Sequence, residues 1–255
     1  MRLRTQVGCW AAAAVCAAPA LLTPGAGQAQ GFGLNEIGSC AIGRGFATTG
    51  APCDDASTLY WNPAAITTLR GLGLYVGGSA IAVGGRFTAD STLRVDEGDV
   101  PIEFPPFLGL TWKGSGARTS RLALGVAAYV PYGLTSQWRD DFPGRFTALK
   151  ASLQTIYVQP TIAVDIVPGR FSIGAGAIWG HSALELRQGI DLAQQRVPVP
   201  NVPMAQQPTF ARFGIAPGTE FARAELEGDG TAFGAHVGAF LRVTDRLTLG
   251  ARYLT

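Results

Sequence analysis

Residues 153–187 read LQTIYVQPTIAVDIV, then PGR, then FSIGAGAIWGHSALELR. In the first run an apolar residue recurs at every second position from Ile156 to Ile166, and in the second run from Phe171 to Trp179. A period of two with one apolar face is typical of a β-strand. The Pro-Gly-Arg segment between the runs is typical of a tight turn. These residues therefore predict two antiparallel strands joined by a hairpin turn.

Five other segments carry the same alternation. Together with the first two, the predicted strands lie near residues 71–83, 104–113, 121–132, 153–167, 171–187, 224–243 and 247–255. No run after residue 71 approaches the roughly 18 apolar residues that a membrane-spanning helix needs. The sequence therefore predicts an all-β chain.

The connections between these strands alternate in length. Tight turns are expected at residues 114–120, 168–170 and 244–246, and long connections at 84–103, 133–152 and 188–223. Short connections at one end and long ones at the other are typical of an outer-membrane barrel, with periplasmic turns and extracellular loops. A soluble β-sandwich is the alternative, but it needs no such one-sided arrangement. The predicted fold class is an antiparallel transmembrane β-barrel.

Composition excludes several function classes. The chain has 255 residues, of which 47% are hydrophobic and 15% charged. Lysine and arginine are dispersed without a basic patch, so we expect no nucleic-acid partner. No Gly-x-Ser-x-Gly motif is present, and His181 and His236 have no nearby nucleophile pattern or metal-ligand spacing. We expect no enzyme activity, no cofactor and no metal site.

The first 29 residues are predicted to be a signal peptide. Arg2 and Arg4 precede an apolar stretch over residues 7–22, and small residues stand before Gln30. An uncleaved anchor is the less favoured alternative, because the apolar stretch is short. Export places the protein in an oxidising compartment, so Cys40 and Cys53 are expected to form a disulfide, with two free thiols as the alternative.

Residues 30–70 contain short motifs rather than strand alternation. They include Gly-Phe-Gly-Leu-Asn-Glu at 31–36, Asp-Asp-Ala-Ser-Thr at 54–58 and Tyr-Trp-Asn-Pro-Ala at 60–64. In this order, these motifs resemble the N-terminal hatch of the FadL/TodX family of outer-membrane transporters for long-chain fatty acids and other hydrophobic compounds. Residues 131–135 and 249–253 also resemble the family, so the likeness runs from residue 31 to the end of the chain.

Helix-capping chemistry explains part of this segment without the family. Asn62 is a strong N-cap, Pro63 fits the first helical position, and Ala64 can continue a short helix. Asp54 and Asp55 precede a second helix start, so we expect them to cap it rather than to act as acid and base. The resemblance implies that residues 30–70 fill the barrel lumen as a hatch. Asn62, Pro63 and Ala64 are therefore candidate gating residues.

The resemblance also implies a transport route. The ligand is captured by extracellular loops, passes a pocket beside the hatch, and leaves through a lateral gap at the third strand. Phe32 is the candidate residue for both gating and ligand binding, with a simple hydrophobic anchor as its alternative role. Phe210 and Phe213 are candidate ligand contacts in the long connection 188–223, which is either a ligand groove or a self-packed loop. Arg187 is the candidate partner of a carboxylate head group.

Small residues and proline inside the predicted strands suggest where the wall is weak or closely approached. If the hairpin turns about Asp141 and Phe142, Gly125 lies opposite Pro160. This pair either weakens the hydrogen-bond ladder at a lateral gap or marks a tolerated bulge. Glycines at 174, 176 and 180 predict close packing against the hatch or another chain.

The leading functional hypothesis is uptake of long-chain fatty acids across the outer membrane of a Gram-negative bacterium. The alternatives are uptake of aromatic or alkane hydrocarbons and a structural surface barrel without transport. Expected partners are the hydrophobic ligands, outer-membrane lipid, lipopolysaccharide and the barrel assembly machinery. The family uses about fourteen strands and such barrels close with an even number. Residues 71–255 are therefore expected to be the first half of a barrel, a fragment unable to insert alone.

Overall fold

The computed structural model describes residues 33–90, 92–117 and 119–255. The predicted signal peptide, residues 1–29, and the candidate residue Phe32 lie outside the described residues.

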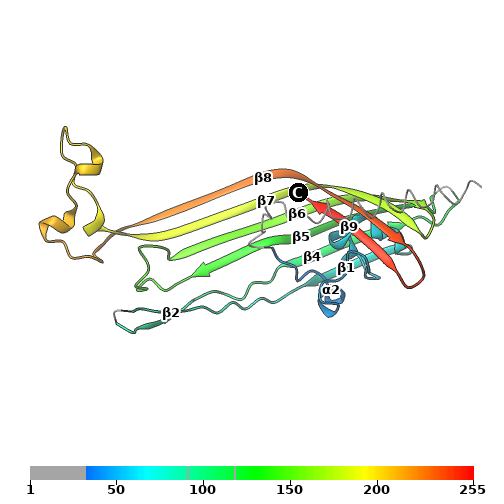
Figure 1. The fold of residues 1–255 in the computed structure, drawn as a ribbon, viewed down its shortest axis with the longest axis horizontal. Helices are drawn as coiled ribbons and strands as arrows, with labels where there is room; N and C mark the ends of the chain where they lie inside the picture. The colour runs from blue at the N-terminus through cyan, green and yellow to red at the C-terminus, as the bar shows by residue number, and fades with distance from the viewer. Residues whose placement is uncertain (1–32, 91, 118) are drawn as a thin grey trace, which may run out of the picture. The chain divides into compact units, whose positions relative to one another are not determined.

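Seven strands form one antiparallel sheet in the order β1-β4-β5-β6-β7-β8-β9, so neighbours in sequence are neighbours in the sheet (Figure 1). The strands are β1 (Leu72–Gly78), β4 (Pro106–Lys113), β5 (Leu122–Gln137), β6 (Lys150–Val167), β7 (Phe171–Asp191), β8 (Glu220–Arg242) and β9 (Thr248–Leu254). The first long connection adds a two-stranded hairpin of β2 (Arg86–Thr88) and β3 (Val95–Glu97). The predicted all-β class is confirmed.

Four strands extend further toward the long connections than the sequence predicts. β7 continues to Asp191 and β8 already begins at Glu220, and the two stay paired in one register up to Ile190 and Ala222. These extensions carry charged residues such as Asp191, Glu220 and Arg223. The apolar alternation ends before these extensions begin. Backbone pairing continues into them because water can solvate their polar side chains.

The outward face of the sheet is apolar. Each strand contributes exposed apolar side chains to it: Leu74, Leu110, Leu124, Ile162, Ile173, Phe233 and Leu249. Phe233 in β8 is 85% exposed and stands beside Trp179 of β7. An exposed apolar surface that crosses every strand of a sheet marks contact with another apolar phase.

The N-terminal segment, residues 33–70, packs on the inward face. It contains α2 (Ser39–Gly43), α3 (Thr58–Trp61) and the 3-10 helix η2 (Pro63–Thr68). Leu59 and Ile66 of this segment are buried in a core with Phe107 of β4 and Tyr129 of β5. None of the described helices has the length and apolar content needed to cross a membrane.

The predicted cap at Asn62 is present. The Asn62 side-chain oxygen accepts a hydrogen bond from the Ala64 amide at 3.0 Å. Its Nδ2 donates to the carbonyl oxygens of Thr49 at 2.8 Å and of Ala239 in β8 at 3.0 Å. One buried side chain thus caps η2 and bonds the N-terminal segment to the sheet.

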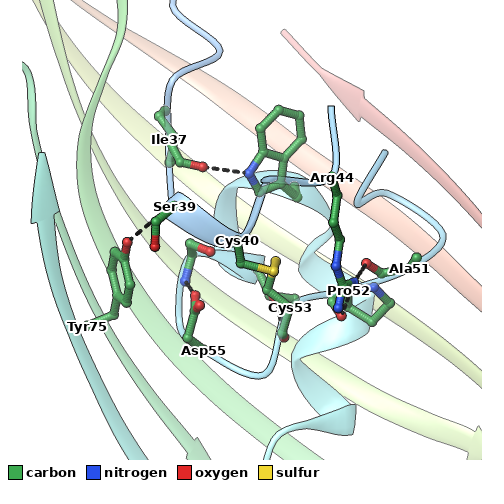
Figure 2. Close-up of a disulfide and its surroundings, with 12 residues drawn as sticks. Ile37, Ser39, Cys40, Arg44, Ala51, Pro52, Cys53, Asp55 and Tyr75 are labelled. Atoms are coloured by element: carbon green, nitrogen blue, oxygen red, sulfur yellow. Dashed lines mark hydrogen bonds between the residues drawn. A yellow bond between two sulfur atoms is a disulfide. The ribbon is translucent and has the colours of Figure 1, made fainter. Parts of the chain in front are cut away.

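A disulfide joins Cys40 in α2 to Cys53, and Figure 2 shows its surroundings. On one side the Arg44 guanidinium donates to the carbonyl oxygens of Ala51 and Pro52. On the other side Asp55 accepts a hydrogen bond from the Ser57 amide at 2.8 Å. Ser57 is the N-cap residue of α3 and no side chain of the described residues caps this helix, so the expected capping by Asp54 and Asp55 is wrong. The covalent link therefore closes a loop that hydrogen bonds also hold.

Gly174 of β7 and Gly238 of β8 let the start of η2 lie close against the sheet. A Cβ at Gly174 would lie 2.5 Å from the carbonyl carbon of Pro63, and one at Gly238 would lie 2.9 Å from Pro63 Cδ. Close packing is thus present at residue 174, whereas a Cβ at Gly176 or Gly180 would meet side chains of the neighbouring β6. These contacts define the inward face and fix η2 against β7 and β8.

Candidate functional site

The third strand of the sheet, β5, contains a bulge. Tyr129 pairs with Tyr157 of β6, but Tyr132 pairs with Thr155, so two residues of β5 oppose one residue of β6. The two residues are Val130 and Pro131. Proline has no backbone N–H to donate to the ladder, and a bulge bends the strand that contains it. The wall is therefore locally irregular at this point.

The other edge of β5 changes partner at the same place. Pairing with β4 ends at Phe107 and Tyr129. Beyond it, the Leu34 amide donates to the Pro131 carbonyl oxygen at 2.8 Å, and Gly33 forms an antiparallel bridge with Tyr132. The first described residues of the N-terminal segment thus occupy the strand edge that β4 leaves open.

Tyr60 ties this contact to α3. Its hydroxyl donates to the Leu34 carbonyl oxygen at 3.4 Å. Burial raises the pKa of Tyr60, so the hydroxyl keeps its proton and remains a donor. The Tyr60 ring also makes an edge contact with Tyr129 of β5, with ring centroids 5.1 Å apart.

A cavity of about 500 Å³ lies beside the contact between Leu34 and β5. Its walls come from the N-terminal segment, the connection after β1, and strands β5, β6 and β7. The apolar residues that line it are Leu34, Ile81, Val83, Val100, Phe104, Pro105, Pro106, Val130, Leu134, Leu153, Ile156 and Ala183. A concave, mainly apolar site of this volume suits a hydrophobic small molecule.

Few polar groups line this cavity. Among the described lining residues, Glu103 is the only acidic one, His181 is the only other titratable one, and none is lysine or arginine. The Glu103 Oε1 accepts a hydrogen bond from Thr135 Oγ1 at 3.2 Å. Backbone hydrogen bonds of 2.8 and 3.0 Å to Ile81 hold Glu103 in place.

The predicted pairing of Gly125 with Pro160 is wrong. Gly125 pairs with Thr161, and Pro160 pairs with Val126. Gln137 pairs with Lys150, so the connection centres on residues 143 and 144 rather than on 141 and 142. The bulge moves the register back by one residue, which leaves the partner of Gly125 one residue away from the predicted Pro160. The irregularity of the third strand lies at Val130 and Pro131 instead.

Arg187 lies apart from the apolar cavity. Its guanidinium pairs with Glu225 of β8, with Nε and a carboxylate oxygen 3.5 Å apart. It lines a separate polar cavity of about 570 Å³ with Asp99, Lys150 and Trp138 among others. The structure therefore does not bring Arg187 to the cavity beside Leu34.

Phe210 and Phe213 also lie elsewhere. They begin and end the 3-10 helix η5 (Phe210–Phe213), in a connection that also contains η3 (Leu192–Gln194) and η4 (Met204–Gln206). Arg196 donates to the carbonyl oxygens of Ala205 and Gln207, and the Phe210 amide donates to Gln195. These internal bonds close the loop, whereas Met204 and Phe213 are 75% and 65% exposed, so the self-packed loop and the ligand groove both stay predictions.

Asn62, Pro63 and Ala64 are buried at the seam between the N-terminal segment and the sheet. The Ser172 hydroxyl of β7 donates to the Ala64 carbonyl oxygen at 3.0 Å. The Arg252 guanidinium of β9 donates to the Tyr60 carbonyl oxygen and lies over the Tyr60 ring. These three residues therefore anchor the segment and do not line the cavity.

The family resemblance implies that residues 30–34 reach into the ligand pocket, and Leu34 does line the cavity, but sequence reasoning missed the cavity residues Val130 and Glu103. The signal for Val130 was Pro131 inside a strand, because a proline there marks an edge or a bulge. Glu103 gave no signal that would separate it from the other acidic residues of its connection.

Comparison with known proteins agrees with the fold. The family model described as outer membrane protein transport protein (OMPP1/FadL/TodX) matches residues 20–255. Outer membrane protein P1 of Haemophilus influenzae is 26% identical over 189 residues, which cover 67% of this chain and 40% of that protein. The long-chain fatty acid transport protein of Shigella flexneri is 26% identical over 237 residues, which cover 88% of this chain and 51% of that protein. The chain thus spans about half the length of the curated relatives it matches.

Two solved structures share the fold. The crystal structure of a Pseudomonas aeruginosa FadL homologue matches with a TM-score of 0.63 and 22% identity, covering 88% of this chain and 52% of that one. The Ralstonia pickettii toluene transporter TbuX matches with a TM-score of 0.50 and 16% identity, covering 81% and 55%. The antiparallel sheet, the packed N-terminal segment and the family match lead to one conclusion: this chain belongs to the outer membrane protein transport protein (OMPP1/FadL/TodX) family.

Proposed function

We propose that this chain binds hydrophobic compounds in the apolar cavity beside Leu34 and passes them sideways through the outer-membrane wall, as part of a transporter. The observation that supports this proposal most is the position of the cavity. It lies at the bulge of β5, where the N-terminal segment closes the strand edge in place of β4. A ligand in the cavity is therefore next to a wall contact that can open.

In this proposal Gly33 and Leu34 are the gate. The described bonds that hold them to the rest of the chain are few: the Leu34 amide to Pro131, the Tyr60 hydroxyl to Leu34, and the bridge to Tyr132. A hydrogen bond contributes about 1 kcal/mol net. The gate can therefore move at modest cost, whereas Asn62, Pro63 and Ala64 stay fixed by buried bonds to β7 and β8.

The domain organisation belongs to the same proposal. Residues 1–29 serve as the signal peptide, 30–70 as the lumenal hatch, and 71–255 as barrel wall. The apolar outward face contacts outer-membrane lipid, and the charged strand extensions reach the lipopolysaccharide. Insertion uses the barrel assembly machinery of a Gram-negative bacterium.

Long-chain fatty acids are the first substrate class to test, because the Shigella flexneri relative is named a long-chain fatty acid transport protein. Uncharged hydrocarbons are the second class. The observation that favours them is the cavity lining, whose described residues include no lysine or arginine for a carboxylate head group.

Binding of oleate and of toluene to the folded chain in detergent tests the proposal. We expect the chain to bind at least one of the two ligands. Leu34→Trp enlarges a side chain that lines the cavity and should abolish that binding. Leu247→Trp, an equal enlargement in the turn before β9, should leave it intact. Binding that is unchanged in Leu34→Trp would contradict the assignment of the cavity.

A further inference from the structure

Glu103 places a carboxylate in an otherwise apolar cavity. Only its Oε1 has a side-chain hydrogen bond, from Thr135, and no lysine, arginine or histidine among the described residues forms an ion pair with it. Thr135 Oγ1 also lies 3.3 Å from the Ser152 hydroxyl oxygen. The Thr135 hydroxyl therefore has two hydrogen-bond partners, Glu103 and Ser152. The Oε2 of Glu103 has no hydrogen-bond partner among the residues that the structure describes. A ligand in the cavity therefore meets an acceptor that carries a negative charge.

We propose that Glu103 is a specificity-determining residue, which selects uncharged lipophiles with a hydroxyl donor, such as long-chain alcohols or phenols, over lipophilic carboxylates. This inference rests on the proposed function of the cavity. Two negative charges repel each other more strongly beside apolar side chains than in bulk water, because the effective dielectric constant is lower there. A hydroxyl group instead donates to the free Oε2, and a hydrogen bond to an ionised acceptor is stronger than one between neutral groups.

The position of Glu103 supports selection rather than surface solvation. Its backbone pairs with Ile81 in both directions and its carboxylate accepts a hydrogen bond from Thr135 of β5, so the residue is held on both sides of the cavity wall. The apolar side chains of Phe104, Val130 and Leu134 form the same cavity. The chain of a lipophile fits against these residues, which leaves its polar end to meet Glu103.

Binding of two ligands with the same sixteen-carbon chain, 1-hexadecanol and palmitate, tests the inference on the folded full chain in detergent at neutral pH. We expect the wild-type chain to bind the alcohol more tightly. Glu103→Gln keeps the shape and an acceptor but removes the charge, so it should raise the palmitate-to-alcohol affinity ratio by at least about tenfold. Glu103→Lys should reverse the preference. Glu97→Gln, the same change at an exposed residue of β3, is the matched control and should leave the ratio unchanged.

The outcomes separate the inference from the function on which it rests. If both ligands bind and neither Glu103→Gln nor Glu103→Lys changes their ratio, the role of Glu103 is wrong and the cavity remains a binding site. If the folded wild-type chain binds neither ligand, both the proposed cavity and the role of Glu103 fail. Should Glu103→Gln not fold, the ratio measured with Glu103→Lys decides the question.

Discussion

The substitution Gly174→Ala tests whether η2 of the N-terminal segment packs directly against β7. The new Cβ would lie 2.5 Å from the Pro63 carbonyl carbon and 2.6 Å from the Ala64 nitrogen, and both are backbone atoms that cannot rotate away. The two backbones must separate by about 1 Å to restore ordinary contact. That separation also strains the 3.0 Å hydrogen bond from Ser172 to the Ala64 carbonyl oxygen.

Overpacking of this kind costs about 1–3 kcal/mol, and a lost hydrogen bond adds about 1 kcal/mol, so we expect a loss of about 2–4 kcal/mol in unfolding free energy. The assay is urea unfolding of the detergent-folded chain, followed by the fluorescence of its tryptophans, including Trp61, which is buried in α3. Gly230→Ala in β8 is the matched control, because its Cβ would meet no atom within 4 Å. Equal urea midpoints for the two variants would refute the seating of η2 against β7.

Two further predictions concern the disulfide and the loops. Replacing both Cys40 and Cys53 by serine opens a loop with a sequence separation of 13 residues. This change should lower the unfolding free energy by about 3 kcal/mol in the same urea titration. An unchanged urea midpoint would show that the disulfide is dispensable. A hydrogen bond from Arg223 lowers the pKa of Asp140, so this contact is present above the ordinary carboxyl pKa and is lost as pH falls through the lowered value. The protection of amides in residues 138–149, relative to their intrinsic exchange rates at each pH, should therefore fall in acid, and Asp140→Asn should remove that fall. A fall in protection that survives the substitution would argue against the ion pair.

The alternation of apolar residues was enough to predict the seven strands. It works because the outward face meets an apolar phase while the inward face packs on the N-terminal segment, so each strand has two chemically different sides. In β7 and β8 the same reasoning missed only the far ends, residues 188–191 and 220–223. Polar and apolar residues do not alternate there, so nothing in the pattern separates a paired strand from a loop.

The wall register and the cavity could not be obtained in the same way. Hairpin symmetry about residues 141 and 142 gave a wrong partner for Gly125, because the connection centres on residues 143 and 144 and the bulge at Val130 and Pro131 moves the register back by only one residue. The cavity combines residues that are far apart in the sequence, from Leu34 to Ala183. Their proximity depends on strand order and register, which the pattern of one strand does not contain. The cap at Asn62 was predictable because it depends only on its immediate neighbours.

Photo-crosslinking of a diazirine-bearing long-chain alcohol to the folded chain tests most directly whether the cavity beside Leu34 is the ligand site. The account predicts adducts at Leu34 and at Val130 and Leu134 of β5, and competition by unlabelled alcohol. Adducts confined to residues 192–219, or to the outward apolar face of the sheet, would contradict it.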